Sequence, residues 1–285
     1  MYDYHVHSSF SSDCSADMAA VVAKAVDLGV KELCFTDHID KGYRRAEMQP
    51  GRRGQKGQRQ PGMEPGLLEA EIYLPDYFNR IEQVRRAFSS QITVLAGIEL
   101  GVEPSLIQEY DDLARDYDWD FVMASMHTYH GEDFYGGNFF EYGTPEECYR
   151  LYYEELLSCA RSFDGFNVVG HLDLLKRCSE YKEEPKPQLF FDILEKLFIN
   201  LIQRGKGIEV NTSGLRNSHI NETLPSLEVI KLYRALGGEI ITLGSDSHYP
   251  EHLGYKFPEA MTLLKDAGFR YITTFSRQTP AFIRI

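Results

Sequence analysis

The chain alternates short apolar segments with longer segments whose apolar residues recur at helical spacing. Segments such as Leu33-Cys34-Phe35 are brief and rich in residues that favour strands. The segment near 18–28 has helical spacing instead, and Asp17 and Gly29 are suited to cap its start and to end it. The predicted strands lie near 2–6, 31–36, 92–99, 120–126, 167–171, 207–211, 239–243 and 271–275. The predicted helices lie near 18–28, 75–89, 105–116, 145–162, 188–204, 226–236 and 258–266.

This alternation of strands and helices predicts an α/β fold with a parallel sheet. Parallel neighbours need a crossover connection, which helices of this length supply. So many repeats favour a closed βα barrel, although an open doubly wound sheet has the same local pattern. All 285 residues are expected to form one domain, because that length is ordinary for a single α/β barrel. In either architecture the carboxyl ends of the strands meet at one face, where a site is built.

Residue types that bind metals follow the predicted strands at these carboxyl ends. His5 and His7 are two residues apart, so in a strand they point to the same side and can reach one ion. A single histidine at such a place is more often a structural residue, and the prediction therefore rests on repetition of the pattern. The candidates are His5, His7, Asp13, His38, Glu99, His127, His171, Asp246 and His248, which include six of the nine histidines.

Glu99 strengthens the prediction of a metal site. It follows the apolar run Val94-Leu95-Ala96-Gly97-Ile98, where a carboxylate is unfavourable unless it is paired or bound to a cation. Mixed imidazole and carboxylate ligands suit Zn, Mn or Fe and do not select among them. The pattern thus predicts divalent transition-metal ions as cofactors.

Composition narrows the classes of partner. The formal net charge of −13 disfavours general nucleic-acid binding, since phosphate backbones attract basic surfaces, and a small substrate is expected. Every apolar run stops well short of the ~18 residues that suggest a membrane span. The N-terminus lacks the pattern of a secretion signal, so a cytoplasmic protein without a membrane partner is expected. The five cysteines have no CxxC spacing and are expected to be reduced thiols.

A basic, Gly-rich insertion at about residues 41–66 interrupts the alternation. Residues 41–62 contain seven Lys or Arg and one acidic residue, a charge of 7 − 1 = +6 in an otherwise acidic chain. The lack of core-forming side chains predicts a surface loop. The simpler interpretation is a solvated insertion. The alternative is a lid that attracts an anionic substrate, because the segment follows the strand that carries His38.

The order of these motifs resembles that of the polymerase and histidinol phosphatase (PHP) family of metal-dependent phosphoesterases. The family's motifs are HxH, a ligand six residues further on, then His, Glu, His, His and DxH. All nine positions have a counterpart between residues 1 and 248, and the implied fold is a distorted (βα)7 barrel. Asp13 fits the histidinol-phosphate phosphatase branch, whereas many relatives have histidine there. That branch is also indicated by His5-Val6-His7-Ser8-Ser9-Phe10-Ser11-Ser12-Asp13 and by Glu209-Val210-Asn211-Thr212-Ser213-Gly214-Leu215-Arg216.

The resemblance implies two or three bound ions with defined ligands. Glu99 would bridge the first and second ions. The first would be bound by His5, His7, Glu99 and Asp246, the second by Glu99, His127 and His171, and the third by Asp13, His38 and His248.

The implied chemistry is hydrolysis of a phosphomonoester. Two adjacent ions that share a water lower its pKa from ~15.7 towards neutrality, and the bridging hydroxide then attacks phosphorus. Glu99, as the bridge, and Asp246, which can assist the leaving group, are the expected catalytic residues. Arg216 and Arg177 follow strand ends and suit the geometry of phosphate, so they are the expected substrate-binding residues. The alternative interpretation is that each is an ordinary surface arginine without a role in substrate binding.

The leading functional hypothesis is conversion of L-histidinol phosphate to L-histidinol and phosphate in histidine biosynthesis. One alternative keeps the chemistry but changes the substrate to a phosphotyrosine protein, a nucleotide or a DNA end. Another is a non-catalytic metal-binding module, which the complete set of ligands disfavours. The oligomeric state is left open by the sequence.

Overall fold

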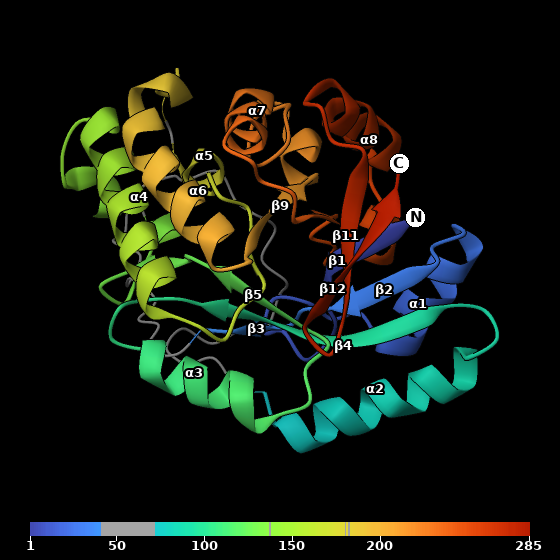
Figure 1. Cartoon of the computed structure of the whole chain (residues 1–285). Coiled ribbons are helices and arrows are strands. Elements are labelled where there is room, and N and C mark those ends of the chain that lie inside the picture. Colours follow the sequence, from blue (N-terminus) through green and yellow to red (C-terminus); the bar gives the residue numbers. More distant parts are fainter. Residues whose placement is uncertain (41–71, 137, 180, 182) are drawn as a thin grey trace.

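The computed structural model describes residues 1–40, 72–136, 138–179, 181 and 183–285, so the predicted insertion at about 41–66 lies outside the described residues (Figure 1). The strands are β1 (Tyr2–Val6), β2 (Glu32–Phe35), β3 (His38–Ile39), β4 (Thr93–Gly101), β5 (Phe121–Ser125), β6 (Thr128–Tyr129), β7 (Glu132–Asp133), β8 (Val168–Val169), β9 (Gly207–Asn211), β10 (Ile241–Gly244), β11 (Tyr271–Ser276) and β12 (Thr279–Arg284). The α-helices are α1 (Met18–Asp27), α2 (Leu74–Phe88), α3 (Ile107–Asp116), α4 (Pro145–Ser162), α5 (Leu175–Cys178), α6 (Phe191–Gln203), α7 (Leu227–Ala235) and α8 (Phe257–Asp266). Short 3₁₀ helices are η1 (Phe134–Gly136), η2 (Asn138–Glu141), η3 (Pro187–Phe190), η4 (Ser213–Arg216) and η5 (Pro250–His252).

Parallel strands form a nearly closed barrel, which confirms the predicted α/β fold. Within the described residues their order is β1-β2-β4-β5-β8-β9-β10, and the short β3 also pairs with β4. β1 and β10 meet just beyond the end of β10, where Val6 forms a parallel bridge with Ser247. The backbone N–H of His7 donates to the carbonyl oxygen of Ser247 at 2.9 Å. This closure brings the first and last strands of the barrel together and rules out the open doubly wound sheet.

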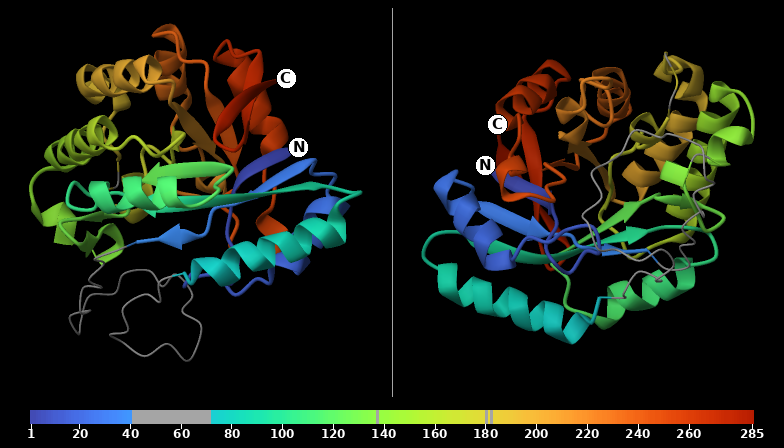
Figure 2. Two further views of the ribbon diagram at one scale, coloured as in Figure 1. Left: turned by 60° about the horizontal axis from the view of Figure 1, so that its bottom comes forward. Right: turned by 180° about the vertical axis from the view of Figure 1, so that it is seen from behind.

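Amphipathic helices pack against the outside of the barrel (Figure 2). In α1 the buried residues include Met18 and Val22, one helical turn apart. Asp17 caps this helix by accepting a hydrogen bond from the backbone N–H of Ala19 at 2.9 Å, and Gly29 adopts a φ of 71° just beyond its end. Both predicted helix signals are therefore confirmed. In the described part of the chain, no helix has the length and apolar character needed to cross a bilayer.

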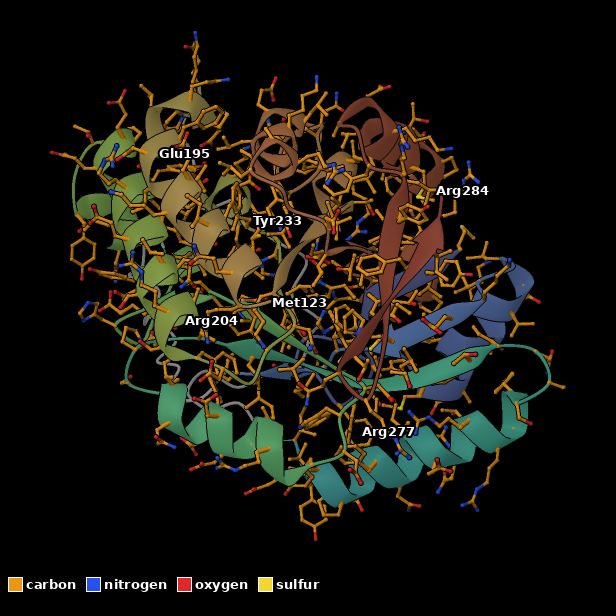
Figure 3. The ribbon with its side chains drawn as sticks, in the orientation of Figure 1. Met123, Glu195, Arg204, Tyr233, Arg277 and Arg284 are labelled. Carbon is orange, nitrogen blue, oxygen red and sulfur yellow. The ribbon has the colours of Figure 1, made fainter. Side chains whose placement is uncertain are left out.

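The carboxyl-terminal segment forms a hairpin that the sequence pattern does not predict. The strand expected near 271–275 is present as β11, but it pairs antiparallel with β12 in a separate two-stranded sheet. Arg277, labelled in Figure 3, lies in the turn of this hairpin, and the next amide, that of Gln278, donates to the carbonyl oxygen of Asp120 at 2.8 Å. The hairpin is thus attached to the residue that precedes β5, which brings Phe275 against the barrel.

Phe275 completes a small apolar cluster on the inner face of the strands. Its ring lies 5.2 Å from that of Phe121 and 6.3 Å from that of Tyr4, measured between centroids. The cluster consists of Tyr4, Cys34, Leu95, Phe121, Met123, Val168 and Phe275. In β2, β4, β5 and β8 the neighbouring residues belong instead to the larger core under the helices, as the alternation of side chains in a strand requires. The hairpin therefore closes the inner core.

Replacing Phe275 with alanine is expected to lower the free energy of unfolding by about 3–5 kcal/mol, because the change removes a buried ring and leaves a cavity. Urea unfolding followed by circular dichroism measures this loss. Phe282→Ala is the matched control, since that side chain is 49% exposed on β12 and its loss should matter little. An unchanged unfolding midpoint for Phe275→Ala would show that the hairpin does not support the core.

Candidate metal centre

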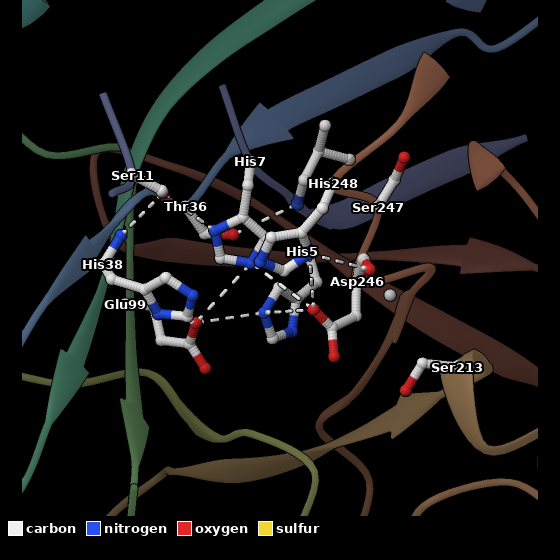
Figure 4. A network of polar contacts seen from close by, with 12 residues as sticks. His5, His7, Ser11, Thr36, His38, Glu99, Ser213, Asp246, Ser247 and His248 are labelled. Atoms are coloured by element: carbon white, nitrogen blue, oxygen red, sulfur yellow. Dashed lines mark hydrogen bonds and ion pairs between the residues drawn. The ribbon is translucent and has the colours of Figure 1, made fainter. Parts of the chain in front are cut away.

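The nine predicted ligands converge at the carboxyl end of the barrel. Figure 4 labels six of them, His5, His7, His38, Glu99, Asp246 and His248. β1 supplies His5, with His7 directly after it, and β4 supplies Glu99. β3 begins with His38, and the other ligands lie in the segments that follow β1, β5, β8 and β10. All of them are buried or partly buried except Asp13, whose side chain is 56% exposed at the rim. Parallel strands alone explain this gathering, since their carboxyl ends lie at one face.

Glu99 lies at the middle of the cluster, and both of its carboxylate oxygens face imidazoles. Oε2 is 2.9 Å from Nδ1 of His38 and 3.2 Å from Nε2 of His5. Oε1 is 2.9 Å from Nε2 of His171 and 3.3 Å from Nε2 of His127. The side chain is fully buried. One carboxylate thus contacts histidines from four segments of the chain, which is the arrangement expected of a bridging ligand.

Several of these polar atoms are buried without a hydrogen bond among the described residues. His38 Nδ1 shows the reason, because it lies close to Glu99 but does not have the alignment that a hydrogen bond requires. An unsatisfied buried polar atom costs about 1–3 kcal/mol, so the cluster is unfavourable as a hydrogen-bonded core. It fits a set of lone-pair donors directed at metal ions. The atoms of this set are His7 Nε2, His38 Nδ1, Glu99 Oε1 and His248 Nε2. His171 Nδ1 also has no hydrogen bond, but the other nitrogen of that ring, Nε2, is the one that faces Glu99.

The ligand atoms fall into overlapping groups, each small enough to hold one ion. Within the described residues the groups are His5-His7-Asp246, His5-Glu99-His171, His38-Glu99-His127 and His7-His38-His248, with the ligand atoms of each group within 4.8 Å of one another. Because the groups share members, ions bound by them would be adjacent. Three of the four ligands predicted for the first ion form one group.

The third predicted ion has a less complete set of neighbours. His38 and His248 group with His7 rather than with Asp13. Asp13 is nevertheless near, with Oδ2 3.1 Å from Nε2 of His248 and 3.8 Å from Nε2 of His38. The assignment of ligands to individual ions stays a prediction.

The electrostatic environment favours ionised carboxylates and a neutral His7. Burial by itself lowers the pKa of His5, His38 and His127, but the neighbouring carboxylates raise it above its ordinary value, so a bound metal must displace protons from these rings. Burial by itself raises the pKa of Glu99, but the surrounding imidazoles, His5 foremost, hold it well below its ordinary value. Burial also opposes ionisation of Asp246, but the Arg177 guanidinium holds the pKa of that carboxyl well below its usual range. Burial lowers the pKa of His7 well below its ordinary value. The carboxylates are therefore ionised and His7 keeps a lone pair, as ligands must.

Outer hydrogen bonds orient the histidine rings, and the sequence-based reasoning missed the residues that make them. Asp40 Oδ1 lies 2.9 Å from Nδ1 of His127. The Ser11 hydroxyl lies 3.1 Å from Nδ1 of His7 and donates to Asp37 at 2.7 Å. Each contact engages the nitrogen that faces away from Glu99, which leaves Nε2 directed inward.

A further outer partner, Glu209, had a sequence signal that was available. It lies in β9 between the core residues Ile208 and Val210, and its Oε1 is 2.7 Å from Nδ1 of His5. A carboxylate inside an apolar strand is as unfavourable here as at Glu99. The same argument that singles out Glu99 therefore applies to Glu209.

The two predicted phosphate-binding arginines both reach the site but differ in their partners. Arg177 donates from Nη2 to Oδ2 of Asp246 at 2.5 Å. Arg216 donates to the carbonyl oxygens of Ser245 and Asp246 at 2.6 and 2.9 Å. Arg216 thus supports the turn in which Asp246 has a φ of 52°. Contact of either arginine with a phosphate stays a prediction.

A parallel barrel with His, Asp and Glu ligands gathered at the carboxyl ends of its strands defines the class as a barrel-based, metal-dependent hydrolase. The chain belongs to the PHP domain family, whose model matches residues 3–213. The family predicted from the order of the motifs is confirmed.

Proteins similar to this chain include a histidinol-phosphatase. That protein, from Lactococcus lactis subsp. lactis, is 30% identical over 280 residues, which cover 96% of this chain and 94% of the relative. A crystal structure of histidinol phosphate phosphatase from the same organism, complexed with zinc, L-histidinol and phosphate, matches with a TM-score of 0.84 and 29% identity. The match covers 98% of both chains. The similarity therefore extends over the whole barrel and its carboxyl-terminal segment.

Proposed function

We propose that this protein is a metal-dependent phosphomonoesterase that hydrolyses L-histidinol phosphate to L-histidinol and phosphate. The observation that carries the proposal is the convergence of eight predicted metal ligands around a ninth, the fully buried Glu99. A histidinol-phosphatase similar over 96% of the chain supports the substrate, as does a relative bound to zinc, L-histidinol and phosphate. A small phosphomonoester as partner and a cytoplasmic location belong to the same proposal.

The cluster is suited to hold two or three divalent ions. We assign them, as predicted, to His5, His7, Glu99 and Asp246, to Glu99, His127 and His171, and to Asp13, His38 and His248. When bound, such ions supply Lewis-acid charge for the phosphate oxygens and lower the pKa of water towards neutrality.

Asp246 lies between the predicted histidine ligands and the two arginines. Its Oδ1 lies 3.5 Å from Nε2 of His7 and 3.5 Å from Nδ1 of His248. Its Oδ2 accepts a hydrogen bond from Arg177. Its main chain is held by Arg216. This carboxylate is therefore placed to act on both the ions and the bound phosphate, which supports its proposed catalytic role.

Arg177 is the better candidate of the two arginines for contact with the phosphate group. Its Nε is buried and has no hydrogen-bond partner among the described residues, while one terminal nitrogen already pairs with Asp246. A guanidinium has five N–H donors and can hold a carboxylate and a phosphate at once. Arg216 instead directs both terminal nitrogens at carbonyl oxygens, so we propose that it acts mainly by positioning Asp246.

Phosphate release from a panel of substrates tests the proposed function. Purified enzyme loaded with Zn, Mn or Fe should prefer L-histidinol phosphate over sugar phosphates, nucleotides and phosphotyrosine, and a chelator should abolish turnover. Preference for another phosphoester would contradict the substrate but retain the metal chemistry. Turnover that resists complete removal of metal would contradict the mechanism.

A further inference from the structure

Glu209 joins three strands of the barrel behind the metal ligands. It is fully buried in β9, and both of its oxygens have partners. Oε1 lies 2.7 Å from Nδ1 of His5, on β1. Oε2 accepts from the backbone N–H of His171, after β8, at 2.7 Å, and from the side-chain amide of Asn211 at 3.2 Å. One carboxylate therefore contacts a ligand ring and the main chain of a second ligand.

The neighbouring strand leaves space for this carboxylate at a glycine. A Cβ atom on Gly244 would lie 1.9 Å from Oε1 of Glu209 and 2.4 Å from Cβ of His5. Both distances are far shorter than van der Waals separation. Any residue larger than glycine at position 244 would therefore displace the side chains of Glu209 and His5. A buried carboxylate is strongly unfavourable unless it is fully hydrogen-bonded. The pairing of Glu209 with a glycine beside it indicates a function for this charge beyond core packing.

We propose that Glu209 is a positioning residue of the metal centre, which sets the tautomer of His5 and fixes the backbone that carries His171. A carboxylate only accepts, so Nδ1 of His5 must donate to it, and the lone pair of the ring is then on Nε2. That nitrogen faces Oε2 of Glu99 at 3.2 Å. Because His5 and His171 are assigned to different ions, Glu209 would preorganise two ions together. The inference rests on the metal centre of the proposed function.

Glutamine has nearly the same shape as glutamate but cannot satisfy both donors. Its oxygen can accept from His5 or from the N–H of His171, and its NH₂ group then faces the other. If the NH₂ group faces Nδ1 of His5, the ring proton moves to Nε2 and blocks the metal-binding nitrogen. If it faces His171, two donors oppose each other and the main chain shifts. Glu209→Gln therefore separates the role of the charge from that of volume.

The test compares metal binding by wild-type enzyme and Glu209→Gln. Zinc affinity measured by competition with a chromogenic chelator should fall by about 10- to 100-fold, the usual effect of losing an outer partner of a ligand. The visible absorption of the cobalt-loaded enzyme should change, because the ligand geometry changes. Thr242→Val is the matched control, since Thr242 pairs with Glu209 in the β9–β10 register and its buried hydroxyl has no partner among the described residues. It should bind zinc as the wild type does.

Wild-type zinc affinity and an unchanged cobalt spectrum for Glu209→Gln would overturn the inference. If that variant does not fold, ¹⁵N NMR of the histidine rings in the zinc-loaded wild type decides the matter. A proton on Nδ1 of His5 with Nε2 bound to zinc supports the proposal, and zinc on Nδ1 overturns it. Failure of the wild type to bind zinc would instead contradict the proposed function, which makes the two failures distinguishable.

Discussion

Replacing Glu99 with glutamine is expected to abolish metal binding and phosphatase activity together. Glu99 is fully buried, and its two oxygens face His38, His5, His171 and His127 at 2.9–3.3 Å. A neutral amide removes the charge that offsets the bound cations and directs N–H groups at imidazole nitrogens. The loss in kcat/KM should exceed the 10- to 100-fold that is usual for an outer partner. Metal content per chain and kcat/KM for L-histidinol phosphate measure it.

Glu103→Gln is the control for this experiment. Glu103 is also a buried carboxylate, two residues beyond the end of β4, but it accepts from the Thr128 hydroxyl and, at 2.7 Å, from the backbone N–H of Gly131. Within the described part of the chain neither of these partners is a predicted ligand, so the variant should keep its metals. Full activity of Glu99→Gln would mean that turnover does not use this cluster and would favour a non-catalytic metal-binding role.

Replacing Arg177 with methionine is expected to produce the second large effect. The guanidinium is only 20% exposed and pairs with Asp246 at 2.5 Å, so the change leaves a buried carboxylate without its cation. It also removes a donor for the phosphate group, and the loss of one such donor typically lowers kcat by about 10²–10³-fold. Steady-state kinetics and inhibition by inorganic phosphate should both show the loss. Arg177→Lys should recover part of the activity, because it restores the charge but not the forked geometry.

Arg150→Met is the matched control for Arg177→Met. Arg150 also pairs with an aspartate, Asp192, at 3.0 Å, but both side chains are exposed on the helices outside the barrel. Exposed pairs contribute about 0–1 kcal/mol, so this variant should behave as the wild type does. Arg177→Met that loses thermal stability but keeps kcat/KM and phosphate inhibition would show a structural role only.

Much of the fold was predictable because it depends on periodicity along the chain. The helix beginning at Met18 and the strand ending at Phe35 fall within about two residues of their predicted limits. The limits of shorter elements were predicted less accurately. The strand expected at 167–171 contains only Val168–Val169. The single domain and the surface loop at about 41–66 stay predictions.

The β11–β12 hairpin is an element whose pairing local sequence patterns do not predict. Residues 271–275 have the composition of a strand in any sheet, and nothing local distinguishes a barrel strand from a hairpin strand. The partner is chosen by distant contacts, the turn at Gln278 with Asp120 and the ring of Phe275 with Phe121. Such contacts exist only in the folded barrel, which brings together residues far apart in the chain.

The predicted metal ligands and their order were determined by the sequence itself. Ligand chemistry depends on residue type, and His5, Glu99 and Asp246 occur where strands end, so the parallel fold must gather them. Only the tertiary structure decided how each ligand is oriented. Glu209 contacts His5 across a separation of 204 residues. Arg216 donates to the main-chain carbonyl oxygen of Asp246 and so supports that turn. Hydrogen-bond direction depends on angles and distances between strands, and these exist only once the barrel has closed.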